Sequence, residues 1–550
     1  MPRFLIGLSA LAMFASSALA QAFSIDRLDH HIRTLSDDSF EGRAPGTVGE
    51  RMTVAYLSGA FSAVGLEPGG DLREDGTRAW TQDVILNRST MTEAPALFLN
   101  IDGERVPMVQ DQDLAVRAPV NGSQRVELED VPLIFVGYGA HAPERNWSDF
   151  KDIDVAGKVI VALVNDPDFE TGEGVFGGEA MTYYGRWTYK YEEAARRGAA
   201  GVLVIHETEP ASYPWGVIAN GNDTTLDIVR DDPAAAHSGL QGWMHVDIAR
   251  RLFEAAGTTY EDAKRMAQQR DFQPMDLGAT MDARLVTQKE RITVKNVVGL
   301  LPGSSRPDEH VVFTAHHDHL GVGQPDETGD TIYNGAIDNA TGLALMIELA
   351  RSFVEAGGTE RSLVFLAVGA EESGLLGARY YAANPLYRLE KTAGVINMDA
   401  PGVHGPTRDF SISGSAKLGL LDLLIEEAEE QGRGYSSDPN PAAGSFFRSD
   451  HFPFAQAGVP AVSFRSGRDL VEGGTERAAA IAAAYSAEHY HQQSDEWSPD
   501  WDLSGLVADA SLIFAVAKRL GNSSEWPNWA EGSEFKALRD ASAAARSPVR

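Results

Sequence analysis

The sequence contains no cysteine among its 550 residues. It can therefore form no disulfide, it offers no thiolate as a nucleophile or metal ligand, and it has no cysteine for a lipid anchor. A catalytic metal would have to be bound by histidine and carboxylate side chains. Basic residues are also scarce, because 47 Lys and Arg stand against 79 Asp and Glu, a formal net charge of -32. This charge argues against a nucleic-acid partner and against binding to an anionic membrane.

Long apolar runs are absent except at the N-terminus. Arg3 precedes the apolar stretch 4–14, and Ala18 and Ala20 are small residues of the kind that precede a signal cleavage site. The stretch is shorter than the roughly 20 residues that span a bilayer. We therefore predict a signal peptide, a mature chain that begins near Gln21, export to the periplasm or the cell exterior, and no membrane span after the signal is removed.

The rest of the chain has the composition of a globular protein, with 43% hydrophobic and 23% charged residues. At this length we expect more than one domain. Two N-terminal helices are followed, from about residue 120, by short strand-like runs such as VPLIFVGYGA and KVIVALVND, which indicate an inserted β-rich domain. The predicted division is a signal peptide over 1–20, the first part of the main domain over 21–118, the insertion over 119–285, the catalytic part over 286–520 and a C-terminal tail over 521–550.

Strands and helices alternate from residue 292 onward. The apolar runs HVVFTA, SLVFLAVGA, AGVINM and PAVSFRSG predict strands, and helices are expected over 341–355, near 375–383 and over 503–520. This alternation predicts an α/β domain with a doubly wound, mostly parallel or mixed sheet. The tail beyond residue 521 is polar, and we expect it to be irregular.

Polar side chains follow several of these apolar runs directly. In an open α/β sheet, ligands bind outside the carboxyl ends of the strands, so these residues are candidates for one site. A further candidate is a histidine in the segment EHYHQQSDEW. The candidate metal ligands are His316, Asp338, Glu372, Asp399 and His491.

Two histidines and three carboxylates form a set that suits catalytic zinc. Two zinc ions need one bridging carboxylate, and five side chains then suffice. In an extended segment His316 and Asp318 point to the same side, so we expect the Asp318 carboxylate to accept a proton from His316 and fix its tautomer. Taken singly, each of these residues also fits a surface or turn position. The prediction of a metal site therefore depends on their occurrence together.

Five segments, TAHHDHLG, NGAIDNATG, GAEESGLLG, INMD and YHQQSDE, resemble in order and spacing the metal-site blocks of the M28 zinc aminopeptidase family. The flanking segments SFEGRAPGTVGER and FRSDHFPFAQAGVPA are similar to that family too. The insertion resembles a protease-associated (PA) domain, which would either restrict substrates or be inert.

The resemblance implies a zinc exopeptidase with two zinc ions per chain. It makes His316 and Asp399 ligands of one ion, Glu372 and His491 ligands of the other, and Asp338 the bridge. Further implied roles are Glu371 as the general base and Tyr490 as a hydroxyl that stabilises the oxyanion. A cis peptide bond between Asp338 and Asn339 is also implied.

The implied reaction is removal of N-terminal residues from peptides by a zinc-activated water. Dipeptidase and carboxypeptidase specificities stay open, as does the oligomeric state. One alternative is a glutaminyl cyclase, which resembles the same motif set but works with a single zinc. A second, from another class, is a noncatalytic binding ectodomain that has lost metal ligands, although all five candidate ligands are present here.

Overall fold

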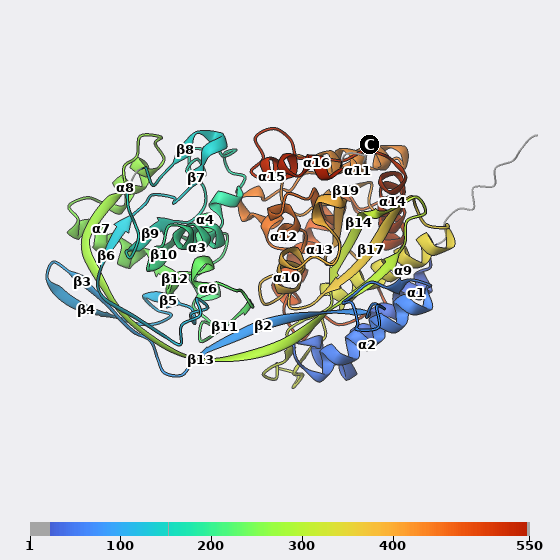
Figure 1. Cartoon of the computed structure of the whole chain (residues 1–550), viewed down its shortest axis with the longest axis horizontal. Coiled ribbons are helices and arrows are strands. Elements are labelled where there is room, and N and C mark those ends of the chain that lie inside the picture. Colours follow the sequence, from blue (N-terminus) through green and yellow to red (C-terminus); the bar gives the residue numbers. More distant parts are fainter. Residues whose placement is uncertain (1–22, 152, 547–550) are drawn as a thin grey trace, which may run out of the picture.

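The computed structural model describes residues 23–151 and 153–546. The predicted signal peptide over 1–20 lies outside these residues. Within the described residues, no helix combines the length and the apolar character needed to cross a bilayer. Figure 1 shows two lobes side by side, one formed mainly by the middle of the chain and the other by its two ends.

The main lobe is built on a mixed sheet, which confirms the predicted α/β class. Four neighbouring pairs are parallel, β17 with β14, β14 with β18, β18 with β21 and β19 with β20, whereas β13 runs antiparallel to β17 and β19 runs antiparallel to β21. The strands in spatial order are β11 (Thr224–Ile228), β2 (Thr81–Met91), β13 (Met275–Leu301), β17 (Arg361–Val368), β14 (Arg306–His316), β18 (Thr392–Met398), β21 (Ala461–Ser466), β19 (Asp409–Ile412) and β20 (Gly434–Tyr435), and the short β1 (Glu67–Pro68) pairs with the end of β13.

Helices cover both faces of this sheet because its central strands are apolar on both sides. Along β17, Leu363, Phe365 and Ala367 join one core cluster, while Val364 and Leu366 join another on the opposite face. The first face is covered by α1 (Ile25–Leu35), α2 (Val48–Ala63), α9 (Thr341–Glu355), α11 (Gly419–Glu430) and α14 (Ser504–Asn522), and the second by α10 (Leu376–Ala383) and α12 (His451–Gln456). The two predicted N-terminal helices and the helices near 341–355, 375–383 and 503–520 are all present.

The middle lobe has its own sheet and its own core clusters. Its strands in spatial order are β4 (Glu104–Met108), β3 (Ala96–Ile101), β13, β6 (Arg125–Phe135), β9 (Val159–Leu163), β10 (Gly201–His206), β12 (Leu240–His245) and β5 (Leu114–Val116). Its longer helices are α3 (Trp187–Arg196), α7 (Val246–Ala255) and α8 (Tyr260–Ala267).

One strand belongs to both sheets. The first part of β13 pairs with β3 and β6, and its second part pairs with β2 and β17, without interruption at residue 285, where the insertion was expected to end. Figure 1 shows β13 curving beneath both lobes, with β2 beside its second part. The lobes are therefore joined through the backbone of a shared strand.

One local expectation is wrong, and one helix was not predicted. The tail is not irregular, since α15 (Lys536–Ala541) forms and Trp529 and Phe535 are buried in the main core. The segment between β21 and α14 also contains a helix, α13 (Gly474–Glu488), which has no buried residue. Residues 541–550 were expected to fray, but Ala543–Arg546 form the short helix α16, and 547–550 lie outside the described part of the chain.

Candidate metal centre

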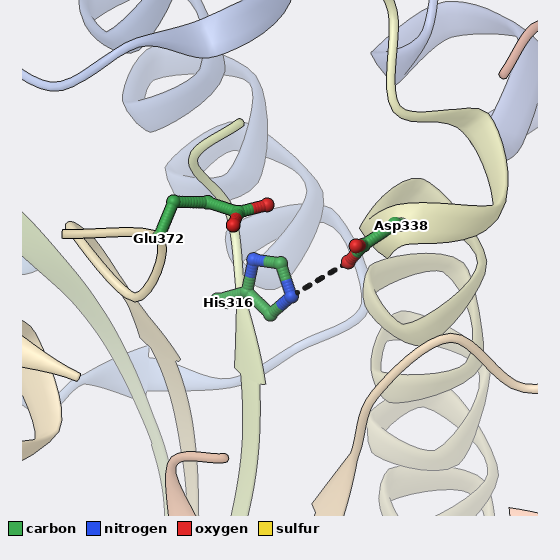
Figure 2. Close-up of side chains that lie close together, drawn as sticks. All are labelled: His316, Asp338 and Glu372. Atoms are coloured by element: carbon green, nitrogen blue, oxygen red, sulfur yellow. Dashed lines mark ion pairs between the residues drawn. The ribbon is translucent and has the colours of Figure 1, made fainter. Parts of the chain in front are cut away.

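The candidate ligands converge because three parallel strands end at one edge of the sheet. His316 is the last residue of β14, Glu371 and Glu372 follow β17, and Asp399 follows β18. Asp338 comes from the turn before α9, and Figure 2 shows its carboxylate facing the imidazole of His316, with Glu372 on the other side. One ligand atom from each of His316, Asp338 and Glu372 lies within 4.8 Å of the others.

Asp338 lies between two pairs of ligands. Its Oδ1 is 3.0 Å from His316 Nε2, and the same nitrogen is 3.5 Å from Asp399 Oδ1. Its Oδ2 is 3.5 Å from His491 Nε2, which is itself 3.2 Å from Glu372 Oε2. All five predicted ligands therefore form one cluster, in which each oxygen of Asp338 faces one pair of a histidine and a carboxylate.

These contacts leave lone pairs unsatisfied. The buried Asp338 Oδ1 and His491 Nε2 make no hydrogen bond among the described residues, although each has an oppositely polar atom nearby. Buried polar atoms normally find a partner. Carboxylate and imidazole atoms that converge without hydrogen bonding to one another fit a bound cation such as zinc.

The cluster is strongly negative, and the pKa values of its histidines reflect this. Burial alone would lower the pKa of His491, but contact with Asp338 and Glu372 raises it to about 10. Burial likewise opposes protonation of His316, yet the surrounding carboxylates, Glu371 foremost, raise its pKa well above the usual value. A divalent cation would offset this negative charge.

Glu371 differs from its neighbour Glu372 in its surroundings. Burial raises the pKa of Glu371 well above its usual range, and the carboxylates of Glu372 and Asp450 act in the same direction, whereas His316 opposes them. Contact with His319 and His491 outweighs burial at Glu372 and lowers its pKa. The pKa values of the two adjacent glutamates are thus shifted in opposite directions.

The expected contact between the Asp318 carboxylate and His316 is wrong in detail. His316 Nδ1 lies 3.1 Å from the backbone carbonyl oxygen of Asp318. The Asp318 carboxylate instead accepts the backbone N–H groups of Glu371 at 3.0 Å and Glu372 at 3.3 Å. Asp318 therefore still orients the imidazole, but through its main chain, and its side chain positions the two glutamates. His317 faces away, with Nε2 2.7 Å from the Lys295 carbonyl oxygen.

Tyr490 lies at the mouth of the cluster. Its side chain is exposed, with 47% of its surface accessible, and its ring stacks on the imidazole of His491 with centroids 3.9 Å apart. It lines the same cavity as Glu371 and Glu372. Although much of the side chain is accessible, loss of water around the hydroxyl inside the cavity and then the nearby carboxylates raise its pKa, so this group carries its proton at neutral pH.

Three residues that sequence reasoning left without a role support the ligands. His319 Nδ1 lies 2.8 Å from Glu372 Oε1, and Ser449 Oγ donates to Asp399 Oδ2 at 2.6 Å. Asp495 accepts the backbone N–H groups of Ile337 at 3.0 Å and Asp338 at 3.1 Å. All three lie inside segments quoted in the sequence analysis, HHDH, FRSDHF and YHQQSDE. Their place in these segments was the sequence feature that could have identified them.

Unusual backbone geometry surrounds the ligands. The peptide bond between Asp338 and Asn339 is cis, as the resemblance implied. Ala370, directly before Glu371, has φ 57°, Ala400, directly after Asp399, has φ 49°, and His491 itself has φ 59°. Non-glycine residues rarely adopt this left-handed region, and such residues concentrate at functional sites.

Comparison with known proteins agrees with this site. Residues 296–515 match peptidase family M28. The chain is 25% identical over 298 residues to the aminopeptidase YwaD of Bacillus subtilis, covering 52% of this chain and 53% of that protein. It is 35% identical over 111 residues to a probable zinc metalloprotease of Pyrenophora teres f. teres, covering 20% of this chain and 23% of that protein. The chain thus spans about half the length of the first relative and about a quarter of the second.

Among solved structures, an aminopeptidase from Aneurinibacillus sp. strain AM-1 aligns with a TM-score of 0.47 and 17% identity, covering 92% of this chain and 95% of that one. The family match extends from the second half of β13 to α14, and so includes all five clustered ligands. Residues 296–515 of this chain form a peptidase family M28 domain.

Proposed function

We propose that this protein is a zinc-dependent exopeptidase, an aminopeptidase that removes N-terminal residues from peptides. The observation that carries the proposal is the position of Asp338, whose two carboxylate oxygens face separate pairs of a histidine and a carboxylate. A bridging carboxylate of this kind is what two neighbouring zinc ions require. In this proposal His316 and Asp399 hold one ion, Glu372 and His491 hold the other, and Asp338 contacts both.

Zinc in this cluster would supply Lewis acidity, which activates water as a nucleophile and polarises the peptide carbonyl. Glu371 is the proposed general base. Glu371 lines the same cavity as the ligand Glu372, and its raised pKa suits a group that takes a proton and later returns it to the departing amine. The hydroxyl of Tyr490 keeps its proton and is the proposed hydrogen-bond donor to the developing oxyanion.

The proposal is tested by measuring zinc content together with the products formed from a library of peptides. We expect two zinc ions per chain, loss of single N-terminal residues, and loss of activity after treatment with a chelator. A single zinc with products that have lost only ammonia would identify a glutaminyl cyclase instead. Absence of any reaction at full zinc occupancy would favour a noncatalytic ectodomain.

His316→Gln and His317→Gln form a matched pair for this experiment. The two histidines are adjacent and both are buried, but only His316 contacts the ligand carboxylates, whereas His317 Nε2 lies against the Lys295 carbonyl oxygen. His316→Gln should lower zinc content, and His317→Gln should not. Equal zinc loss in both variants would mean that the effect is structural and that the ligand assignment has no support.

A further inference from the structure

A cavity of about 720 Å³ separates the two lobes and opens onto the candidate metal centre. One end is lined by Glu371, Glu372 and Tyr490. Its walls come from both lobes, and include Trp187 and Tyr191 of the middle lobe and Phe447 and Pro453 of the main lobe. A peptide held at the metal centre would therefore extend into this cavity.

The cavity is rich in arginine although the protein is strongly acidic. Six arginines line it: Arg117, Arg186, Arg196, Arg230, Arg379 and Arg448. Three of them have a carboxylate partner, namely Arg196 with Glu193 at 2.8 Å, Arg230 with Asp227 at 3.0 Å and Arg379 with Glu192 at 4.0 Å. Over residues 23–151 and 153–546, Arg117, Arg186 and Arg448 form no ion pair.

Arg186 is the most unusual of these side chains. It is only 8% exposed, and its buried Nε has no hydrogen-bond partner in the described part of the chain. Burial lowers its pKa to about 10, and repulsion from Arg448 and Arg379 acts in the same direction. A buried guanidinium normally has a carboxylate or several acceptors around it. The charged groups near Arg186 are other arginines. An anion from outside the chain would therefore supply both the missing opposite charge and the missing hydrogen-bond acceptor for Nε.

We propose that this cavity binds a carboxylate of the peptide substrate, with Arg186 and Arg448 as the recognising residues. The inference rests on the proposed function and adds a substrate class to it, peptides that carry a negative charge beyond the bond to be cleaved. Guanidinium groups bind carboxylates through paired N–H donors, which gives direction as well as attraction. The basic cavity would also attract such peptides past the negative surface of the protein.

A peptide carboxylate has two sources, the C-terminus of a short peptide or an acidic side chain. Two substrate pairs distinguish them: trialanine against its C-terminal amide, and Ala-Glu-Ala-amide against Ala-Gln-Ala-amide. If the cavity binds the C-terminal carboxylate, the wild-type kcat/KM should be about tenfold to a hundredfold higher for trialanine than for its amide. If it binds an acidic side chain, the same preference should appear for Ala-Glu-Ala-amide over Ala-Gln-Ala-amide. Arg448→Gln, at an exposed position, and Arg186→Gln should reduce that ratio toward one while uncharged peptides are still cleaved.

Arg196→Gln is the matched control, because Arg196 lines the same cavity but is already paired with Glu193. Glu193 keeps a second partner, Arg197 at 2.7 Å, after this change. The control should retain most of the preference. No preference in wild type for either pair, or a ratio unchanged in both Arg186→Gln and Arg448→Gln, would overturn the proposal.

Binding to Glu371→Gln protein, measured by calorimetry with the same peptides, separates this inference from the proposed function. Preferential binding of the charged peptide without any hydrolysis by wild type would support the anion site and contradict the exopeptidase activity. Hydrolysis by wild type with equal binding of charged and uncharged peptides would support the activity and contradict the anion site.

Discussion

The carboxylate of Asp318 accepts the backbone N–H of Glu371 at 3.0 Å, which ties the loop after β14 to the loop after β17. A second bond, from the N–H of Glu372 at 3.3 Å, uses the other carboxylate oxygen. The backbone positions of Glu371, the proposed base, and Glu372, a proposed ligand, thus depend on the buried side chain of Asp318. These two hydrogen bonds involve the backbone N–H groups of the glutamates and not their carboxylates.

Asp318→Asn should lower kcat by about tenfold to a hundredfold and destabilise the fold by about 1 to 3 kcal/mol, because one backbone N–H would face an amide group in place of a carboxylate oxygen. Kinetics and urea unfolding measure the two effects. If the variant keeps full activity, the two glutamates do not depend on this carboxylate for their position.

Glu371→Gln and Glu372→Gln should both lower activity, but for different reasons. The first should keep its zinc and most of its peptide affinity while kcat falls by roughly 10²-fold to 10⁴-fold, the range for loss of a general base. The second should lose zinc at one site and regain part of its activity when zinc is in excess. Zinc analysis and initial rates decide between them, and near-normal turnover or a missing zinc in Glu371→Gln would mean that the base is another residue.

Arg43 connects the N-terminal segment to the loops beside the metal centre. It is 1% exposed, and its guanidinium donates to the carbonyl oxygens of Leu35 at 2.6 Å, His317 at 3.0 Å and Gly335 at 2.9 Å. Arg43→Met would remove this donor from all three oxygens, of which Gly335 keeps a bond from the Ala340 N–H at 3.3 Å, and should cost about 3 kcal/mol. Urea unfolding tests this, and a loss below about 1 kcal/mol would show that these oxygens find other donors.

Stability should fall between pH 7 and pH 5 partly because of His310, which is 4% exposed and has no partner for Nδ1 in the described residues. Burial lowers its pKa from 6.5 to about 4. Below about pH 6.5 the His310 side chain binds a proton in the unfolded chain but not in the folded chain. The neutral, buried His310 therefore contributes fully to the free energy of unfolding above pH 6.5, and this contribution is lost as the pH falls toward 4.

His310→Gln should remove roughly 2 kcal/mol of the difference in unfolding free energy between pH 7 and pH 5, because its side chain does not titrate. Urea unfolding of wild type and variant at both values measures this. An unchanged difference would assign the pH dependence to other groups.

The central strands and their polar ends were predictable because they are unbroken apolar runs followed directly by polar residues, as in HVVFTA before His316. The role of Asp318 was not, because the alternation of side chains applies only within a strand and β14 ends at His316. Helix α13 was missed because it buries no residue and so has no apolar periodicity. The packing of Trp529 and Phe535 depends on contacts with distant segments, which a polar local sequence does not indicate.

The shared strand β13 also has a consequence for how the chain must fold. Its second part pairs with β2, with Met91 opposite Thr287 and Thr81 opposite Val297, so almost the whole middle lobe lies between the partners. Closing such a long loop is costly unless the intervening chain is already compact. We expect the middle lobe to fold first and bring the partners together, so that a substitution in its core would delay assembly of the metal centre without touching a ligand.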